Sequence, residues 1–285
     1  METLIQVEEL SRKIEKIFPM PQTLMKINEA LNNPNVNMAR LEDILKSDPD
    51  FSFKLLSLAN SAFYGSPNKV TNMHMAITLL GFNAIKNLAI QTSVQQTFGG
   101  DKPESCVPTQ MIWKHSVGVA VCVKMLSRRL KLGNAEDFFT MGILHDLGFL
   151  IEAQFYSLPL SQMLERVNRE KYSLTDLESE VLGMDHAQIT HLLAEKWSLP
   201  KTLTTTLKHH HEPLDAPEEN RRSASALYLA DKIVMQAKYG FTYARAGETD
   251  EAVLALLQLE PVDMEVMLED FQVEADQFAA LLKQG

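Results

Sequence analysis

The spacing of apolar residues constrains the fold of this chain more than any other sequence feature. Apolar side chains recur every three to four residues almost throughout, and no segment shows the strict alternation of a half-buried strand. Glycine and proline contribute only 12 residues each, which disfavours a turn-rich β protein. With 285 residues, of which 45% are hydrophobic, the chain is long enough to bury a large core. The pattern therefore predicts an all-α protein.

The predicted helices fall into two sets. The first set follows an amphipathic segment at Leu4–Ile17 and covers residues 22–31, 39–47, 51–63, 73–80 and 82–97. The second set covers residues 110–131, 136–152, 160–170, 174–183, 185–197, 201–209 and 221–238. Between the sets lies a turn-rich segment, Gly99–Ser105, which is the best linker candidate. About three further helices are expected after Gly240.

Residues that commonly cap helices predict some of the helix ends. We expect Asp50 to cap the helix that starts after Pro49, and Gly65 and Gly81 to end helices. Ser173, with Asp176 three residues later, resembles a capping box at the start of the helix at 174–183.

The net charge of −10 is concentrated at the C-terminus. Residues 246–285 contain ten acidic side chains against Lys283 alone, whereas the rest of the chain is nearly neutral. Nucleic-acid binding calls for a clustered basic face, and Arg128, Arg129 and Lys131 are instead typical of cations in the last turn of a helix. We therefore expect no direct nucleic-acid binding. The acidic tail is expected to be a solvated helical face, with a partner-binding surface as the alternative.

The sequence predicts a cytoplasmic protein without a membrane partner. No apolar run reaches the roughly 20 residues that a membrane span needs. The N-terminus lacks the basic start and apolar core of a signal peptide. Cys106 and Cys122 are too few for a disulfide framework. The sequence leaves the oligomeric state open.

Histidine and aspartate residues on apolar helix faces form the candidate functional site. His115, His186 and Asp231 each lie among apolar residues at helical spacing, and His145 and Asp146 stand side by side within one predicted helix. A buried aspartate is costly unless it is paired, hydrogen-bonded or bound to metal. If the helices converge, a shared metal site would satisfy the whole set. This set comprises His115, His145, Asp146, His186, His210, His211 and Asp231.

Imidazole and carboxylate ligands suit one or two divalent transition metal ions, and Fe, Mn, Ni and Zn are all compatible. A single inward-facing histidine is more often a hydrogen-bonded core residue, so the convergence of the helices stays open at this point. We expect His74 and His191 to be structural and His209 to be the spare member of its triplet. Cys122 is expected to be a small core residue rather than a nucleophile.

Motifs in the first half of the chain resemble a known family. The segments FPMPQ from Phe18, SDPD from Ser47, LSLANSAFYG from Leu56 and AITLLGF from Ala76 resemble the HDOD domain, the HD-related output domain of bacterial signalling proteins. Three segments of the second half fit the same family, namely GMDH from Gly183, EKWSLP from Glu195 and HHEP from His210.

The order of the histidine and aspartate residues is similar to the ligand order of the HD phosphohydrolase superfamily, in particular its HD-GYP phosphodiesterase branch. The resemblance covers roughly residues 12–240. It implies an N-terminal helical HDOD subdomain at 12–100 packed on an HD-like helical subdomain at 108–240. The acidic tail at 241–285, which the resemblance does not cover, is expected to be helical and to form a third part. It also implies a role in bacterial signal transduction. Most members of the family are thought to be non-catalytic because they have lost many HD ligands, whereas here every matched ligand position is occupied.

The chain departs from the HD-GYP enzymes at two motifs. After the His-Asp pair those enzymes have Ile-Gly-Lys, whereas this chain has Leu147, Gly148 and Phe149. That lysine is expected near the substrate phosphate, and a phenylalanine supplies neither charge nor hydrogen-bond donor. The Gly-Tyr-Pro motif is also absent after His211. Both departures weaken a prediction of cyclic di-GMP hydrolysis.

Two functions are compatible with these observations. The favoured one is a signalling module that binds a signalling protein or a small nucleotide-type ligand and retains its metal site. The alternative is a metal-dependent phosphohydrolase or phosphodiesterase acting on a nucleotide or cyclic dinucleotide, with Asp146 as a catalytic bridge between two metals. In that case the resemblance implies one ion on His115, His145 and Asp231, and the other on His186, His210 and His211.

Overall fold

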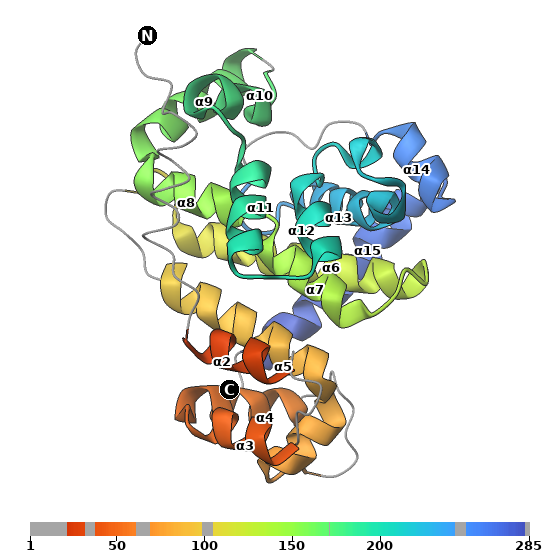
Figure 1. Cartoon of the computed structure of the whole chain (residues 1–285). Helices are drawn as coiled ribbons and strands as arrows, with labels where there is room; N and C mark the ends of the chain where they lie inside the picture. The colour runs from red at the N-terminus through yellow and green to blue at the C-terminus, as the bar shows by residue number, and fades with distance from the viewer. Residues whose placement is uncertain are drawn as a thin grey trace. The chain divides into compact units, whose positions relative to one another are not determined.

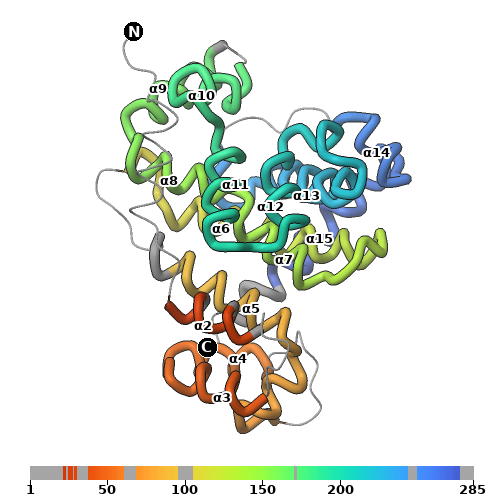
Figure 2. The backbone as a smooth tube through the Cα atoms, in the orientation of Figure 1, coloured from red at the N-terminus to blue at the C-terminus, as the bar shows by residue number. Residues whose placement is uncertain are grey.

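The chain folds into helices joined by short connections (Figure 1). The computed structural model describes residues 22–31, 38–60, 69–98, 105–170, 172–242 and 249–282. No β-strand occurs in these ranges, which confirms the predicted all-α class. The predicted helix at Leu4–Ile17, Gly65 and most of the linker candidate lie outside them. Figure 2 follows the backbone through the same elements and marks the remaining residues in grey.

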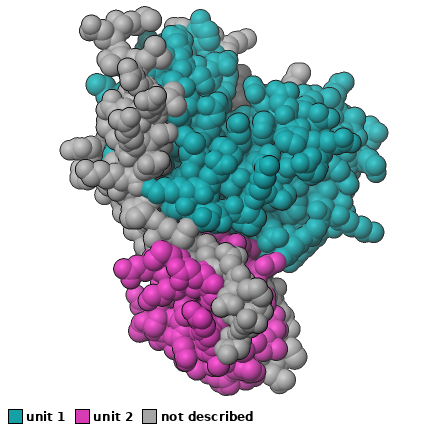
Figure 3. All heavy atoms as spheres, in the orientation of Figure 1, with its two compact units in different colours: residues 1–19, 98–275 teal, residues 20–97, 276–285 magenta. Residues whose placement is uncertain are grey.

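The helices group into two compact units (Figure 3). Unit 1 is formed mainly by Phe98–Ala275, and unit 2 mainly by Met20–Thr97. Each unit buries its own apolar side chains, as expected for helical layers that must cover their apolar faces. The three-part division expected from the sequence stays a prediction.

Unit 2 contains α2 (Gln22–Leu31), α3 (Met38–Lys46), α4 (Pro49–Ala59) and α5 (Met73–Phe98). Asp48 caps α4, because its carboxylate accepts a hydrogen bond from the backbone N–H of Phe51 at 3.0 Å. The prediction that Asp50 is the cap is wrong. The helix already begins at Pro49, a residue suited to the first helical position because no intrahelical N–H bond is needed there.

Helix α5 is interrupted at Gly81, where φ is +75° and ψ is 168°. This confirms the prediction that Gly81 separates two helices, since glycine adopts a positive φ without steric cost. One stretch of α5, Met73–Gln95, is long enough to cross a membrane, and its mean hydropathy of 1.2 is apolar enough to do so. The prediction that no apolar run has the length of a membrane span is therefore wrong. However, 56% of the 18-residue window that meets these two criteria is buried inside the structure, and buried core helices meet the same criteria.

Unit 1 is built around α6, which packs against two other helices of the unit. Most residues of α6 are buried, so its sides face protein rather than solvent. The helices of unit 1 are α6 (Thr109–Arg129), α7 (Ala135–Leu144), α8 (Leu147–Phe155), α9 (Ser157–Glu170), α10 (Leu174–Leu182), α11 (His186–Lys196), α12 (Lys201–Lys208), the short η1 (Pro213–Asp215), α13 (Glu218–Gln236), α14 (Glu251–Leu257) and, as far as Ala275, α15 (Pro261–Leu282). The neighbours of α6 are α7 and α13, which lie beside it in Figure 1.

His145 and Asp146 lie between two helices, not within one. The predicted helix at 136–152 is divided into α7 and α8, and Asp146 has the non-helical angles φ −100° and ψ 22°. Consecutive side chains in a continuous helix point about 100° apart. The break changes their relative directions and lets both side chains face the same centre.

The starts of α10 and α11 differ in whether a side chain caps the first turn. Ser173 precedes α10 but its side chain makes no cap bond; its hydroxyl instead pairs with Thr175 Oγ1 at 2.6 Å, so the predicted capping box does not form. At α11 the carboxylate of Asp185 accepts a hydrogen bond from the backbone N–H of Gln188 at 2.7 Å. This cap places His186 at the first position of α11.

The acidic C-terminal segment packs on unit 1 as far as Ala275. Its described part contains α14 and α15, where the sequence suggested about three helices. Leu257, Met267 and Phe271 are at most 1% exposed. Arg129 also pairs with Asp263 at 3.2 Å and Asp270 at 3.4 Å. Because exposed ion pairs contribute little free energy, the apolar contacts dominate this docking.

The close approach of α6 and α7 depends on Gly142. A Cβ at this position would lie 2.4 Å from the Ala120 Cα and 2.5 Å from its backbone nitrogen. We expect Gly142→Ala to lower the free energy of unfolding by about 1–3 kcal/mol, although alanine is the better helix former. Urea unfolding followed by circular dichroism measures the change. Glu165→Ala on α9 is the control, because the Glu165 side chain is 65% exposed. Equal stability of the two variants would contradict the packing argument.

Candidate metal centre

Five structural elements of unit 1 bring the seven candidate residues together. They come from α6, the turn between α7 and α8, the start of α11, the segment after α12, and α13. In the order of the chain these residues are His115, His145, Asp146, His186, His210, His211 and Asp231. His211 is partly exposed, and the other six side chains belong to residues that are at most 6% exposed. The convergence that the sequence left open is thus present.

Asp146 lies at the centre of the cluster. Its Oδ2 is 3.2 Å from His145 Nε2 and 3.7 Å from His115 Nε2. Its Oδ1 is 3.5 Å from His186 Nε2 and 3.7 Å from His210 Nε2. Each carboxylate oxygen therefore faces a different pair of imidazoles.

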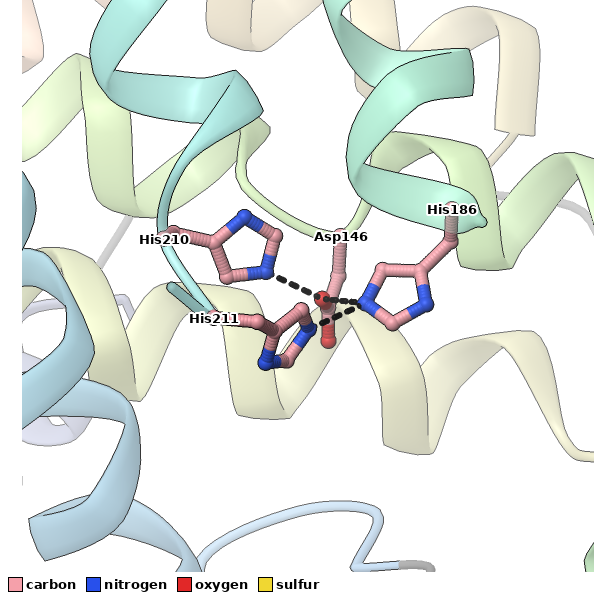
Figure 4. A group of neighbouring side chains, drawn as sticks. All are labelled: Asp146, His186, His210 and His211. Carbon is pink, nitrogen blue, oxygen red and sulfur yellow. Dashed lines mark hydrogen bonds and ion pairs between the residues drawn. The ribbon is translucent and has the colours of Figure 1, made fainter. Parts of the chain in front are cut away.

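The candidate ligand atoms form two groups that share Asp146. In the first group, Asp231 Oδ1 lies 2.9 Å from His115 Nε2 and 3.9 Å from His145 Nε2. In the second group, His211 Nε2 lies 2.6 Å from His186 Nε2. Figure 4 shows the second group, with His186, His210 and His211 arranged around the carboxylate. The division is the one that the HD resemblance implies.

The outer ring nitrogens of two histidines contact backbone carbonyls, which hold the rings in position. His145 Nδ1 lies 2.8 Å from the Gly142 carbonyl oxygen, and His210 Nδ1 lies 2.7 Å from the Leu207 carbonyl oxygen. A protonated Nδ1 donates a hydrogen bond to such a carbonyl and leaves the Nε2 lone pair free to bind a metal.

Several inner nitrogens lack a hydrogen bond. Within the part of the chain that the structure describes, Nε2 of His115, His145 and His210 has no hydrogen-bond partner. Buried polar atoms are rarely left in this state, and converging imidazole and carboxylate atoms are the donor set that transition metals bind. The residues therefore fit one or two metal ions.

Charge interactions shift the pKa values of the central groups. Burial opposes ionisation of Asp146, but the positive charge of His145 and the close approach of the His145 and His210 imidazoles outweigh it and hold the Asp146 pKa well below its usual range. Burial lowers the pKa of His211, and the neighbouring His210 and His186 lower it further. For His186, burial is outweighed by the charge of Glu178, which raises the His186 pKa to about 9. The cluster thus combines a carboxylate that stays ionised, that of Asp146, with imidazoles of different basicity.

Two buried carboxylates beside the cluster are not among the residues predicted from the sequence. Glu178 on α10 and Glu152 on α8 are both 0% exposed. Burial, and then the charge of Glu178, raises the pKa of Glu152 well above its usual range. The position of Glu178 on the apolar stripe with Leu174 and Leu182 is the sequence signal that could have identified it.

A close contact between α8 and α11 supports the second group. The backbone N–H of Gly148 donates to Thr190 Oγ1 at 2.8 Å, and the Thr190 hydroxyl donates to the His145 carbonyl at 3.1 Å. A Cβ at Gly148 would lie 2.0 Å from the His186 carbonyl oxygen, so only glycine fits. These contacts fix the His-Asp turn against the start of α11.

Phe149 occupies the position at which HD-GYP enzymes have lysine. It is 1% exposed, its ring lies 5.9 Å from the His186 ring, and it stacks on Phe241 at 5.6 Å. The backbone N–H of Phe241 donates to the Met111 carbonyl on α6 at 2.9 Å. At Gly240, where φ is +87°, a Cβ would lie 2.3 Å from the His115 nitrogen. The segment after α13 therefore packs closely beside the candidate ligands.

The remaining histidines lie outside the two groups, as expected. His74 is exposed and lies 2.8 Å from a carboxylate oxygen of Glu42, while His191 Nδ1 lies 3.0 Å from the Thr204 carbonyl oxygen. His209 belongs to neither group. Cys122 is fully buried, and burial raises the pKa of its thiol, which agrees with a core role.

Comparison with known proteins identifies the family. The HDOD domain model matches residues 17–213, more than half of the chain. The chain therefore belongs to the HDOD family. The match contains all candidate ligands except Asp231.

Solved structures share this fold. A candidate phosphohydrolase from Shewanella amazonensis has 22% identity and a TM-score of 0.71, with 96% of this chain and 97% of that chain covered. An HDOD domain protein of unknown function from Geobacter sulfurreducens has 23% identity and a TM-score of 0.68, with 96% and 93% covered. A curated relative from Treponema pallidum, itself uncharacterized, is 23% identical over 79% of this chain. The chain spans 43% of the length of that relative.

The pKa of His186 predicts how metal binding depends on pH. Below pH 9 a metal must displace the Nε2 proton of the His186 imidazolium, because the charge of Glu178 raises the His186 pKa to about 9. We expect the apparent metal affinity to rise about tenfold per pH unit for each proton released between pH 7 and 9, and to level off above. Competition with a chelator, corrected for the chelator's own protonation, measures it. A flat profile over this range would contradict the charge assignment.

Proposed function

We propose that this chain is a regulatory module of bacterial signal transduction whose unit 1 holds one or two divalent transition metal ions. The observation that carries the proposal is the position of Asp146, whose two oxygens face different imidazole pairs at 3.2–3.7 Å. His115, His145 and Asp231 would hold one ion, and His186, His210 and His211 the other, with Asp146 bridging them.

The donor set supports a transition metal over magnesium or calcium. Imidazole nitrogens predominate over carboxylate oxygens among the candidate ligands, and such sites suit Fe, Mn, Ni or Zn. When bound, these ions supply positive charge that compensates the buried carboxylates and act as Lewis acids toward a phosphoryl oxygen. The burial of Asp146 and Asp231 means that this compensation would also stabilise unit 1.

A regulatory role is favoured by the surroundings of Phe149. The side chain is fully buried between His186 and Phe241, at the position where the related hydrolases place a phosphate-binding lysine. An apolar ring cannot stabilise charge that develops on a phosphate. A missing charge contact of this kind is worth about 2–4 kcal/mol in the transition state, or about two to three decades in rate.

The output of the module would be binding. We propose a signalling protein or a small nucleotide-type ligand as the partner, in line with the family. A cytoplasmic location is part of the proposal, supported by the two free cysteines and by the burial of more than half of the apolar stretch of α5.

A second candidate function is metal-dependent phosphoester hydrolysis on a nucleotide or cyclic dinucleotide. The complete set of converging ligands favours it, because a module without catalysis does not require all seven residues. In that reaction Asp146 would be the catalytic residue, since its carboxylate would hold both ions, which would supply Lewis acidity to a phosphoryl group.

Elemental analysis tests the metal centre. We expect about one or two transition metal equivalents in wild-type protein purified anaerobically without chelators, and none in the His145→Ala/Asp146→Ala variant. The His74→Ala variant is the control, because His74 is exposed and lies in unit 2. Circular dichroism confirms that each variant is folded. Wild-type protein that is empty and cannot be loaded would overturn the proposed metal centre.

Turnover assays separate the two functions. With Mn²⁺ or Fe²⁺ added, we expect wild type and Asp146→Ala to release phosphate or nucleoside monophosphate from cyclic dinucleotides and nucleotides at the same background rate. The reason is that the apolar ring of Phe149 cannot stabilise the charge that develops on the reacting phosphate. A wild-type rate about tenfold or more above that of Asp146→Ala would favour the hydrolase instead.

A further inference from the structure

We propose that Glu178 is a positioning residue that aims His186 at Asp146 and thereby sets the affinity of the second metal group. The inference rests on the proposed metal centre and deepens it. It assigns a role to a buried side chain that is not itself a candidate ligand.

Both hydrogen bonds of Glu178 Oε2 go to a single residue, His186. Its Oε2 accepts a hydrogen bond from the His186 backbone N–H at 3.0 Å and lies 2.7 Å from His186 Nδ1, which donates to it. Both residues are 0% exposed. Two bonds to one oxygen fix both the backbone and the ring of His186, so that its Nε2 lies 3.5 Å from Asp146 Oδ1.

The same carboxylate also stabilises the start of α11. His186 is the first residue of this helix, where backbone N–H groups lack intrahelical partners and the helix dipole favours negative charge. Asp185 caps the Gln188 N–H, and Glu178 takes the N–H of His186. Glu178 therefore connects α10 to the ligand-bearing end of α11.

His186 differs from the other histidines of the centre in the partner of its outer nitrogen. His145 and His210 rely on backbone carbonyls of Gly142 and Leu207, which substitution of side chains does not remove. His186 relies on a carboxylate, which makes its imidazole a stronger electron donor to a metal than a carbonyl partner would. This difference makes the positioning role testable by substitution.

Metal affinity is the decisive measurement. We expect Glu178→Gln and Glu178→Ala to weaken binding of Co²⁺ or Mn²⁺ by about 10–100-fold, with alanine the larger effect, because glutamine keeps an acceptor but not the charge. Competition with a chelator gives the affinity. Glu180→Gln is the matched control, because Glu180 lies on the same helix but its side chain is 52% exposed. We expect it to bind as wild type does.

Two further readouts separate positioning from a general loss of structure. The absorption spectrum of the Co²⁺ protein should change in Glu178→Gln, because the geometry and basicity of one imidazole ligand change, while the Glu180→Gln spectrum should not. In metal-free wild type, ¹⁵N NMR should show His186 protonated on Nδ1 in a strong hydrogen bond. The NMR readout needs no variant and remains decisive if the Glu178 variants do not fold.

The outcomes distinguish this inference from the proposed function. If wild type binds metal and the folded Glu178 variants bind equally well with the same spectrum, the positioning role is wrong and the metal centre stands. A His186 ring without a proton on Nδ1 would also overturn the positioning role. If wild type binds no metal, the metal centre itself is wrong, and the positioning role falls with it.

Discussion

The burial of the Asp146 carboxylate is the constraint on which unit 1 depends. A carboxylate that is 4% exposed costs several kcal/mol unless positive charge or hydrogen bonds surround it. Here the compensation comes from imidazoles on α6, α11 and the segment after α12. These elements must therefore meet at one point, and their meeting determines how the helices of unit 1 pack.

Backbone contacts make this meeting possible. Gly142 lets α7 approach α6, and Gly148 lets α8 approach the carbonyl of His186. Glu178 then ties the start of α11 to α10. On the other side, Phe149 stacks on Phe241, so the surroundings of the centre are apolar where a phosphate-binding charge would be needed. The same packing that assembles the candidate ligands thus provides no positive charge at Phe149 for a reacting phosphate, which is why we propose a regulatory role.

Local sequence signals predicted the elements better than their ends. Apolar spacing placed most helices within a few residues, and Gly81 was identified as a break. The prediction of a continuous helix through His145 and Asp146 was wrong. At this break Thr190, which is far away in the sequence, bonds to the Gly148 N–H and to the His145 carbonyl, and no local pattern indicates such contacts. The choice of Asp50 as a cap failed because the competing Asp48 lies before the proline that starts the helix.

The sequence by itself determined the helical class, the family and the identity of the candidate ligands. These follow from apolar spacing, motifs and residue chemistry, all of which are readable along the chain. Only the tertiary structure decided that the ligands converge, that Asp146 faces two groups, and that Glu178 holds His186. It also decided that the acidic tail docks through Phe271. The physical reason is that these features depend on contacts between residues far apart in sequence, whose distances no local pattern encodes.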